Sequence, residues 1–282
     1  MPTATVHPMT RWPFAPGGGQ VASGYHADDP QYRASSDALG EGNLFHRKHW
    51  EWVFIHATAE RAGLLRDGSS ALGFGVGREP LVSAFAERGV RVVATDQPSG
   101  SAGAWADTGQ HSEQVRELLR PEICATERFD RLVSFRAVDM TSLPDDLGEH
   151  DLVWSSCCFE HLGSADAGFA FVRDAMRFVA PGGVAVHTTE FDLARFRSLR
   201  ESGSTAAGDY VCFYRRREIA RLVRRLRAEG FGATVDLRVS RDHPMERKVD
   251  RVPYSHDPHL RVAVADRVIT SVGIVVRRPL HT

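Results

Sequence analysis

Two short groups of ionisable residues mark candidate reaction chemistry in this 282-residue chain. Glu160 and His161 follow the segment DLVWSSCCF, and His187 and Glu190 lie in the segment VAVHTTE. Histidine is the usual base near neutral pH, so we expect His161 or His187 to deprotonate an oxygen nucleophile. In the same step, Glu160 would orient the histidine or accept a proton. Glu190 would contact the substrate. The alternative for Glu160 is a helix start, where an acid complements the helix dipole.

The glycine loop GFGVG is a second candidate site. Backbone N–H groups between a strand and a helix receive the polar parts of nucleotides. The dinucleotide pattern G-x-G-x-x-G fails here, because Gly73, Gly75 and Gly77 are followed by Arg78 at the sixth position. A phosphate-binding P-loop is also excluded, since no Gly-Lys-Ser/Thr follows. Asp96, at the end of the next expected strand, could accept both ribose hydroxyls of an adenosine-type ligand.

The elements that must position these residues alternate between strands and helices. Apolar spacing predicts helices near residues 50–65, 81–86, 169–179 and 219–226. Strands are expected to end near residues 73, 96 and 139, and to span 151–156, 184–188, 233–239 and 268–276. This alternation predicts an α/β fold with a doubly wound, mostly parallel sheet of seven strands.

Five segments in register resemble the class I S-adenosylmethionine-dependent methyltransferases, which have a Rossmann-like fold. They are ALGFGVG, VVATD, AVDMTSLP, DLVWSSCCFEHL and FVAPGGVAVHTTEF, and they cover about residues 71–191. The resemblance implies S-adenosyl-L-methionine as the cofactor, with Asp139 at the adenine amino group and Met140 against the adenine ring. The cofactor-binding residues expected on this basis are Gly73, Gly75, Gly77, Asp96, Gln97, Asp139, Met140 and Ser156.

A divalent metal is an alternative that the sequence does not favour. Some members of the family resemble this chain after the fourth strand, but their segment reads Glu-x-x-Glu-His. Those members bind a divalent ion. This chain has Cys157-x-x-Glu160-His161, so the first carboxylate is absent. A hard cation such as magnesium prefers oxygen ligands, and cysteine replaces them poorly. Glu190 or His187 could complete such a site.

The segments outside these motifs are expected to form lids and acceptor-binding loops. Residues 1–42 are rich in turn formers and are interpreted as an N-terminal arm, either a lid or disordered, before a methyltransferase domain at 43–282. The helix that follows the arm is a further lid candidate. Tyr254 and His256, in a polar loop, are candidate substrate-binding residues, with a solvated turn as the alternative reading of that loop.

The composition argues against several kinds of partner. Thirty-five basic and 36 acidic residues give a net charge of -1, so no positive field favours nucleic acid or an anionic membrane. No run approaches the roughly 18 apolar residues of a membrane-spanning helix. The N-terminus has no apolar signal-peptide region, and the four cysteines have no metal-ligand spacing. A reduced, cytoplasmic protein is therefore expected.

These observations together predict a methyltransferase that acts on a hydroxyl of a small molecule, such as a saccharide or a natural product. A histidine base would take the hydroxyl proton. Methyl transfer to carbon or nitrogen of a small molecule is the alternative within the family. A catalytically silent cofactor-binding protein is the alternative from another class. Acceptors are recognised by loops rather than by strand motifs, so the sequence does not name the acceptor.

Overall fold

The computed structural model describes residues 12–40, 42, 45–98, 115–194, 211–255 and 257–280. Within these ranges, none of the helices has both the length and the apolar character needed to cross a bilayer. His256, a predicted substrate-binding residue, lies outside the described residues.

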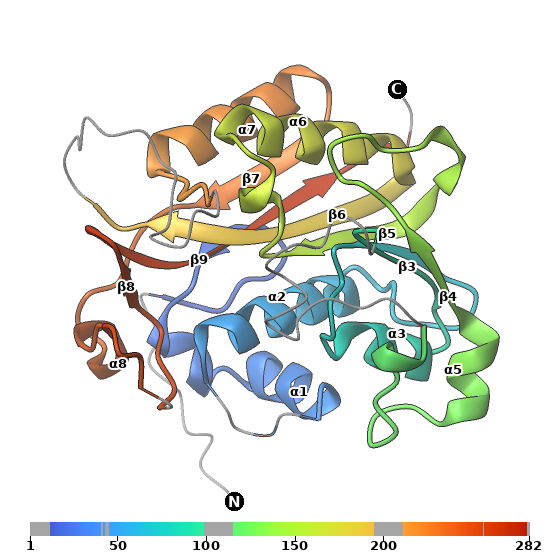
Figure 1. Ribbon diagram of the computed structural model, residues 1–282, viewed down its shortest axis with the longest axis horizontal. Coiled ribbons are helices and arrows are strands. Elements are labelled where there is room, and N and C mark those ends of the chain that lie inside the picture. Colours follow the sequence, from blue (N-terminus) through green and yellow to red (C-terminus); the bar gives the residue numbers. More distant parts are fainter. Residues whose placement is uncertain are drawn as a thin grey trace, which may run out of the picture.

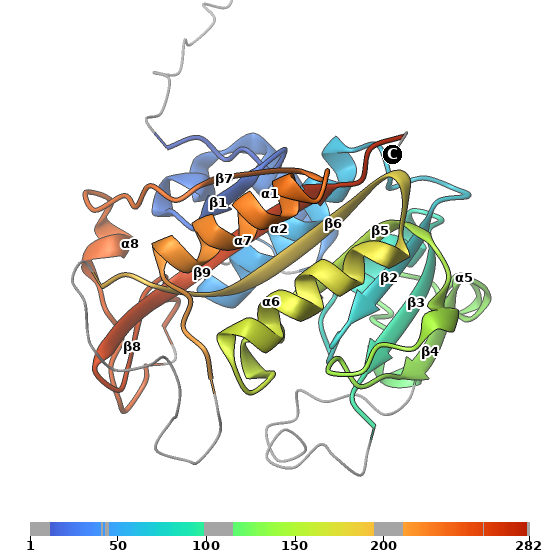
Figure 2. The ribbon, with the colours of Figure 1, turned by 90° about the horizontal axis from the view of Figure 1, so that it is seen from above.

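A nine-stranded sheet forms the centre of the described part of the chain, in the order β1-β7-β9-β6-β5-β2-β3-β4, with β8 paired to β9 (Figures 1 and 2). The strands are β1 (Gly19–Val21), β2 (Ser70–Phe74), β3 (Arg91–Asp96), β4 (Val133–Ala137), β5 (His150–Ser156), β6 (Val179–Asp192), β7 (Gly232–Asp236), β8 (Val262–Val264) and β9 (Arg267–Arg277). Strands β2 to β6 pair in parallel, and β9 is antiparallel to β6 and β7. The prediction of a mostly parallel α/β sheet is confirmed.

The sheet has two strands more than the seven expected. Strand β1 comes from the segment that was expected to be an arm, and it pairs with both β7 and β9. Strand β8 forms a hairpin with β9, and Ala265 in the turn has a positive φ of 51°. Both strands are only three residues long, too short for alternation along the sequence to reveal them.

Helices cover both faces of the sheet (Figure 1). The main helices are α1 (Pro30–Ala38), α2 (Arg47–Arg61), α3 (Leu81–Glu87), α5 (Thr126–Leu132), α6 (Ala165–Asp174), α7 (Arg216–Ala228) and the short α8 (Pro244–Arg247). The side chains of β5 alternate between two apolar cores. Leu152 and Trp154 join the core under α2 and α3, whereas Val153 joins the core under α6 and α7. The two-residue period of a strand thus assigns each side chain to one face.

Residues 12–40 pack as a layer against α2. Phe14, Tyr32 and Leu39 are buried in the core on this face. The indole N–H of Trp50 donates to His26 Nδ1 at 2.8 Å, which ties the segment to α2. These residues are therefore part of the folded structure, and residues 1–11 lie outside the described ranges. The domain division at residue 42 stays a prediction.

The parallel strands end at one edge of the sheet, and the predicted site residues follow those ends. The glycine loop follows β2, Asp96 ends β3, and a three-residue helical turn, η5 (Phe159–His161), follows β5. Glu190 lies near the end of β6, which extends well past β5. The first turn of α2 contacts this edge as well, through Arg47 and Glu190. Ligands of open α/β sheets bind at such carboxyl edges.

The contact between α2 and β9 leads to a stability prediction. A Cβ at Gly273 in β9 would overlap the ring of Phe54 in α2. Gly273→Ala is therefore expected to lower the free energy of unfolding by about 1–3 kcal/mol, through overpacking. The matched control is Gly232→Ala in β7, where the Cβ would lie an ordinary 3.5 Å from the Cβ of Arg277. Urea denaturation measures the free energy of unfolding of both variants. Equal losses of this free energy in the two variants would contradict the packing argument.

Candidate active site

The glycine loop after β2 is closely packed on its inner side. Gly75 has a φ of 59°, in the left-handed region, and a Cβ there would lie 3.0 Å from the Cβ of Cys158 and 3.4 Å from Met140 Sδ. A Cβ at Gly73 would overlap the indole of Trp154. Glycine is thus required at Gly75 for conformation and at both positions for space. The loop is thereby packed directly against Trp154, Cys158 and Met140.

Asp96 links the end of β3 to the glycine loop. Its Oδ2 accepts a hydrogen bond from the N–H of Gly77 at 3.1 Å, and its Oδ1 accepts one from the N–H of Gln97 at 2.8 Å. The side chain is almost buried. These two backbone donors orient the Asp96 carboxylate.

The other predicted cofactor residues lie at the same edge. Asp139 is exposed, and its Oδ1 accepts from the N–H and hydroxyl of Thr141 at 2.8 and 2.7 Å. Met140 is half-buried and would touch a Cβ at Gly75, and Ser156 is buried at the end of β5. The structure therefore brings the predicted cofactor residues of β2, β3, β5 and the β4–β5 connection to one place.

Glu79 is a buried acid that the sequence reasoning missed. Its Oε1 accepts a hydrogen bond from Trp154 Nε1 at 2.9 Å. Burial raises the pKa of Glu79 to about 8, although its bonds to Trp154 and Ser156 act in the opposite direction. In the sequence, the feature that could have identified Glu79 is its position directly after the glycine loop. Glu79 is thus a neutral carboxyl at pH 7, placed behind the loop.

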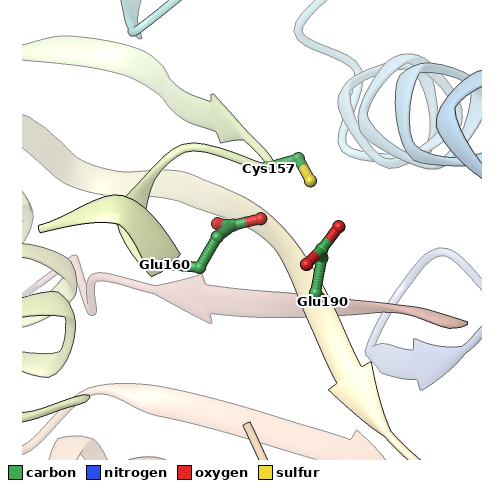
Figure 3. Close-up of side chains that lie close together, drawn as sticks. All are labelled: Cys157, Glu160 and Glu190. Atoms are coloured by element: carbon green, nitrogen blue, oxygen red, sulfur yellow. The ribbon is translucent and has the colours of Figure 1, made fainter. Parts of the chain in front are cut away.

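Three side chains converge beyond the end of β5: Cys157, Glu160 and Glu190 (Figure 3). Their sulfur and carboxylate atoms lie within 4.8 Å of one another. Glu160 is fully buried, and its Oε2 accepts from the Thr189 hydroxyl at 3.0 Å. Its Oε1 accepts no hydrogen bond from the described residues. Burial, followed by repulsion from Glu190, raises the pKa of Glu160 to about 7.

Lys48 acts on this cluster through its charge, and Arg47 is the cation in direct contact with it. From the first turn of α2, its Nη2 lies 3.0 Å from Glu190 Oε1, and its Nη1 lies 3.1 Å from Glu51 Oε1. Nη1 also donates to Cys157 Sγ at 3.7 Å. The buried Glu51 carboxylate further accepts the Ser271 hydroxyl at 2.5 Å. The sequence placed α2 among the lid candidates, and the folded chain instead places Arg47 inside the site.

The cluster does not fit a divalent cation well. Two of its three potential ligands, Cys157 and Glu190, already contact the guanidinium of Arg47. A metal ion would have to displace this cation, and cysteine is a poor ligand for a hard ion. Burial and the charges of Glu160 and Glu51 also raise the pKa of the Cys157 thiol, which keeps it neutral. A divalent metal therefore remains the disfavoured alternative.

His187 lies away from the cluster, in the core under α6. It is fully buried, its Nδ1 lies 2.7 Å from the Ser155 hydroxyl, and its ring packs edge-on against Phe159 and Phe171. Burial lowers its pKa to about 3. The proposed role of His187 as a base therefore finds no support in its position. Alternation along β6 explains this placement, since His187 faces the core opposite to Glu190.

Two other predicted site residues, His161 and Tyr254, differ in how they are placed relative to the cluster. His161 is half-buried and directly follows Glu160 in η5, where its backbone N–H donates to the carbonyl of Cys158 at 3.1 Å. The side chain of Tyr254 is 46% exposed, and its hydroxyl donates to the carbonyl of Ala263 at 2.9 Å. That hydroxyl therefore joins its loop to the end of β8, and no described contact links it to the acid cluster.

Comparisons with known proteins agree with this geometry. Residues 72–187 match the family described as the methyltransferase domain. No curated protein matches the chain significantly in sequence.

Solved structures similar to the chain are methyltransferases of several kinds. The 1,6-didemethyltoxoflavin-N1-methyltransferase of Burkholderia thailandensis is 18% identical, with 91% of this chain and 81% of that chain covered and a TM-score of 0.44. The magnesium protoporphyrin IX methyltransferase of Synechocystis PCC 6803 is 13% identical, with 79% of each chain covered and a TM-score of 0.45. The CcbJ methyltransferase of Streptomyces caelestis is 13% identical, with 78% and 93% covered and a TM-score of 0.46.

The matched family region begins in β2, directly before the glycine loop, and ends in β6. It therefore contains the loop, Asp96, Asp139 and the acid Glu160 in the strand order that brings them to one edge. Residues 72–187 are therefore identified as a methyltransferase domain.

Proposed function

We propose that this protein transfers the methyl group of S-adenosyl-L-methionine to a hydroxyl oxygen of a small molecule, such as a saccharide or a natural product, and that Glu160 accepts the hydroxyl proton. The observation that carries the proposal is the buried Oε1 of Glu160, for which no donor among the described residues has standard hydrogen-bond geometry, although the Cys157 thiol lies close to this carboxyl. Leaving a buried acceptor unsatisfied costs about 1–3 kcal/mol. A hydroxyl of the bound acceptor molecule would supply the missing donor.

The cofactor site is assigned to the residues around the glycine loop. When bound, the cofactor supplies an electrophilic methyl group on a sulfonium. The loop from Gly73 to Gly77 offers bare backbone, and Asp96 would accept the ribose hydroxyls. Asp139 and Met140 would hold the adenine, with Gln97 and Ser156 completing the pocket. The support is their common position at one sheet edge and the close packing that requires glycine at Gly73 and Gly75.

The protein's contribution to the chemistry is to position the acceptor and to take its proton. A general base works best when its pKa lies near the working pH. The pKa of Glu160, raised to about 7 by burial and by Glu190, meets that condition. Once Glu160 takes the proton its charge disappears, and with it the repulsion from Glu190. Glu190, held by Arg47, would also accept a hydrogen bond from the acceptor molecule.

His161 is the second candidate for the base, because it directly follows Glu160 in η5. Nitrogen methylation is a second candidate reaction, since a group of carboxylates would also attract a protonated amine. The site would then bind the protonated amine, and methyl transfer would follow only after the amine had lost a proton. Product analysis with an isotopically labelled cofactor shows whether the methyl group has been transferred to oxygen or to nitrogen.

Replacing the proposed base should remove turnover and keep cofactor binding. Glu160→Gln is expected to lower kcat by about 10²- to 10⁴-fold, the usual contribution of a general base. Its affinity for the demethylated cofactor, measured by calorimetry, should stay within about twofold. His161→Gln is the matched comparison. A loss of kcat in His161→Gln with normal turnover in Glu160→Gln would move the base to His161.

The pH dependence of the wild-type protein follows from the same assignment. A base must be deprotonated before it reacts, so kcat/KM should rise with pH and level off above about 7. Below that pH it should fall tenfold per unit. A pH-independent rate between pH 5 and 9 would contradict a Glu160 base.

Cofactor affinity should depend on Asp96. Asp96→Asn removes the charge that the ribose hydroxyls would contact, and hydrogen bonds to charged groups contribute about 1.5–3 kcal/mol. We expect affinity for the demethylated cofactor to fall about tenfold or more. Asp146→Asn, at an exposed ion pair with Arg136, is the control and should bind normally. Unchanged affinity in Asp96→Asn would contradict the pocket assignment.

A further inference from the structure

Residues 250–255 and 257–260 are organised around one buried carboxylate, that of Asp250. Asp250 accepts hydrogen bonds from the N–H of Arg251 at 3.0 Å, from the N–H of Ser255 at 3.1 Å and from the Ser255 hydroxyl at 3.3 Å. It also pairs with Val262 at the start of β8 through backbone bonds. Asp250 therefore gives a defined shape to a loop that the sequence alone presents as a solvated turn.

A chain of polar contacts runs from this carboxylate to α2. Asp250 Oδ2 lies 2.9 Å from Nδ1 of His259, and Nε2 of His259 lies 3.1 Å from Nε2 of His46. Nδ1 of His46 accepts the backbone N–H of Lys48 at 3.1 Å. His46 is the N-cap residue of α2, so the chain ends at the first turn of that helix.

These contacts determine which nitrogens carry protons. Because Nδ1 of His46 accepts a hydrogen bond, the proton of its neutral ring lies on Nε2 and is donated to His259. His259 must then carry its own proton on Nδ1, which lies 2.9 Å from Asp250 Oδ2 in an ion-pair contact that does not have standard hydrogen-bond geometry. Burial, together with nearby positive charge, lowers the pKa of His46 to about 4, so the ring is neutral at pH 7. The charged or titratable groups that act on the two rings are Arg47, Lys48, His49 and Asp250.

The same two histidines satisfy the start of α2. The first N–H groups of a helix have no partner within the helix. The N–H of Arg47 donates to the carbonyl of His259 at 2.9 Å, and the N–H of Lys48 donates to His46. The backbone of Arg47 is thereby held by the loop, while its guanidinium contacts Glu190 inside the site.

We propose that Asp250, His259 and His46 are positioning residues, which hold the Arg47 guanidinium against Glu190 and so set the charge that faces Glu160. None of the three touches the acid cluster among the described contacts. Their effect passes through the first turn of α2, which carries Arg47 and also Lys48, a cation that lowers the pKa of Glu160. The catalytic consequence rests on the proposed function of Glu160, whereas the structural link between the loop and Glu190 does not.

A double-mutant cycle tests the structural link independently of catalysis. His259→Ala and Glu190→Gln each disturb Arg47, so the double variant should lose less stability in urea unfolding than the two single losses combined. The control cycle pairs His259→Ala with Glu149→Gln, whose carboxylate forms an ion pair with Arg278, and it should be additive. Additivity in both cycles would overturn the proposal.

The pH profile tests the consequence for the reaction. His259→Ala should move the acid limb of kcat/KM to higher pH, because a displaced Arg47 leaves Glu190 to repel the charge of Glu160 more strongly. His259→Gln can still accept from His46 Nε2, so it should return the limb toward the wild-type position. If both variants lose stability and neither moves the limb, the histidines are merely structural and the positioning role is wrong. A wild-type profile without a limb would defeat the Glu160 base, and the double-mutant cycle would then decide the positioning role.

Discussion

The buried guanidinium of Arg47 is the interaction on which the active-site region depends. Burying a charge is costly unless it is paired and hydrogen-bonded, and Arg47 meets the carboxylates of Glu51 and Glu190. Glu51 in turn accepts hydroxyls from Thr188 of β6 and Ser271 of β9. One cation thus joins α2 to two strands of the sheet. Among the ion pairs of the described residues, Arg47 binds Glu51 and Glu190 and does not bind Glu160. The pKa of Glu160 therefore depends on burial and on the other charges near it.

The core of the fold follows from local pattern, because parallel strands and their helices have strong periodicity. The glycine loop, Asp96 and Glu160 could be placed at one edge because the carboxyl ends of parallel strands meet there. Strand β1 could not be anticipated, since its three residues gain their order from β7 and β9, far away in the sequence. Arg47 was equally hidden, because the contact of its helix with the end of β6 is a tertiary property.

The position of His187 shows how a strand separates neighbouring residues. A residue type suited to base chemistry was expected to point into the site, but the two-residue period sends His187 and Glu190 to opposite faces. Thr189 shares the face of His187 and still reaches Glu160, because η5 turns back over the end of the strand. Composition of a strand end therefore indicates candidates, and the register of the strand decides among them.

Strand β9 lies between β6 and β7, although it follows both of them in the sequence (Figure 2). A protein emerging from the ribosome folds its N-terminal parts first. The strands β2 to β5 and the glycine loop can pair early, since their partners are all made early. The contacts of Glu51 and Phe54 in α2 with Ser271 and Gly273 form later, because Ser271 follows Glu51 by 220 residues in the sequence. During biosynthesis, the contacts that hold Glu51 and Phe54 are thus completed only after β9 has been made.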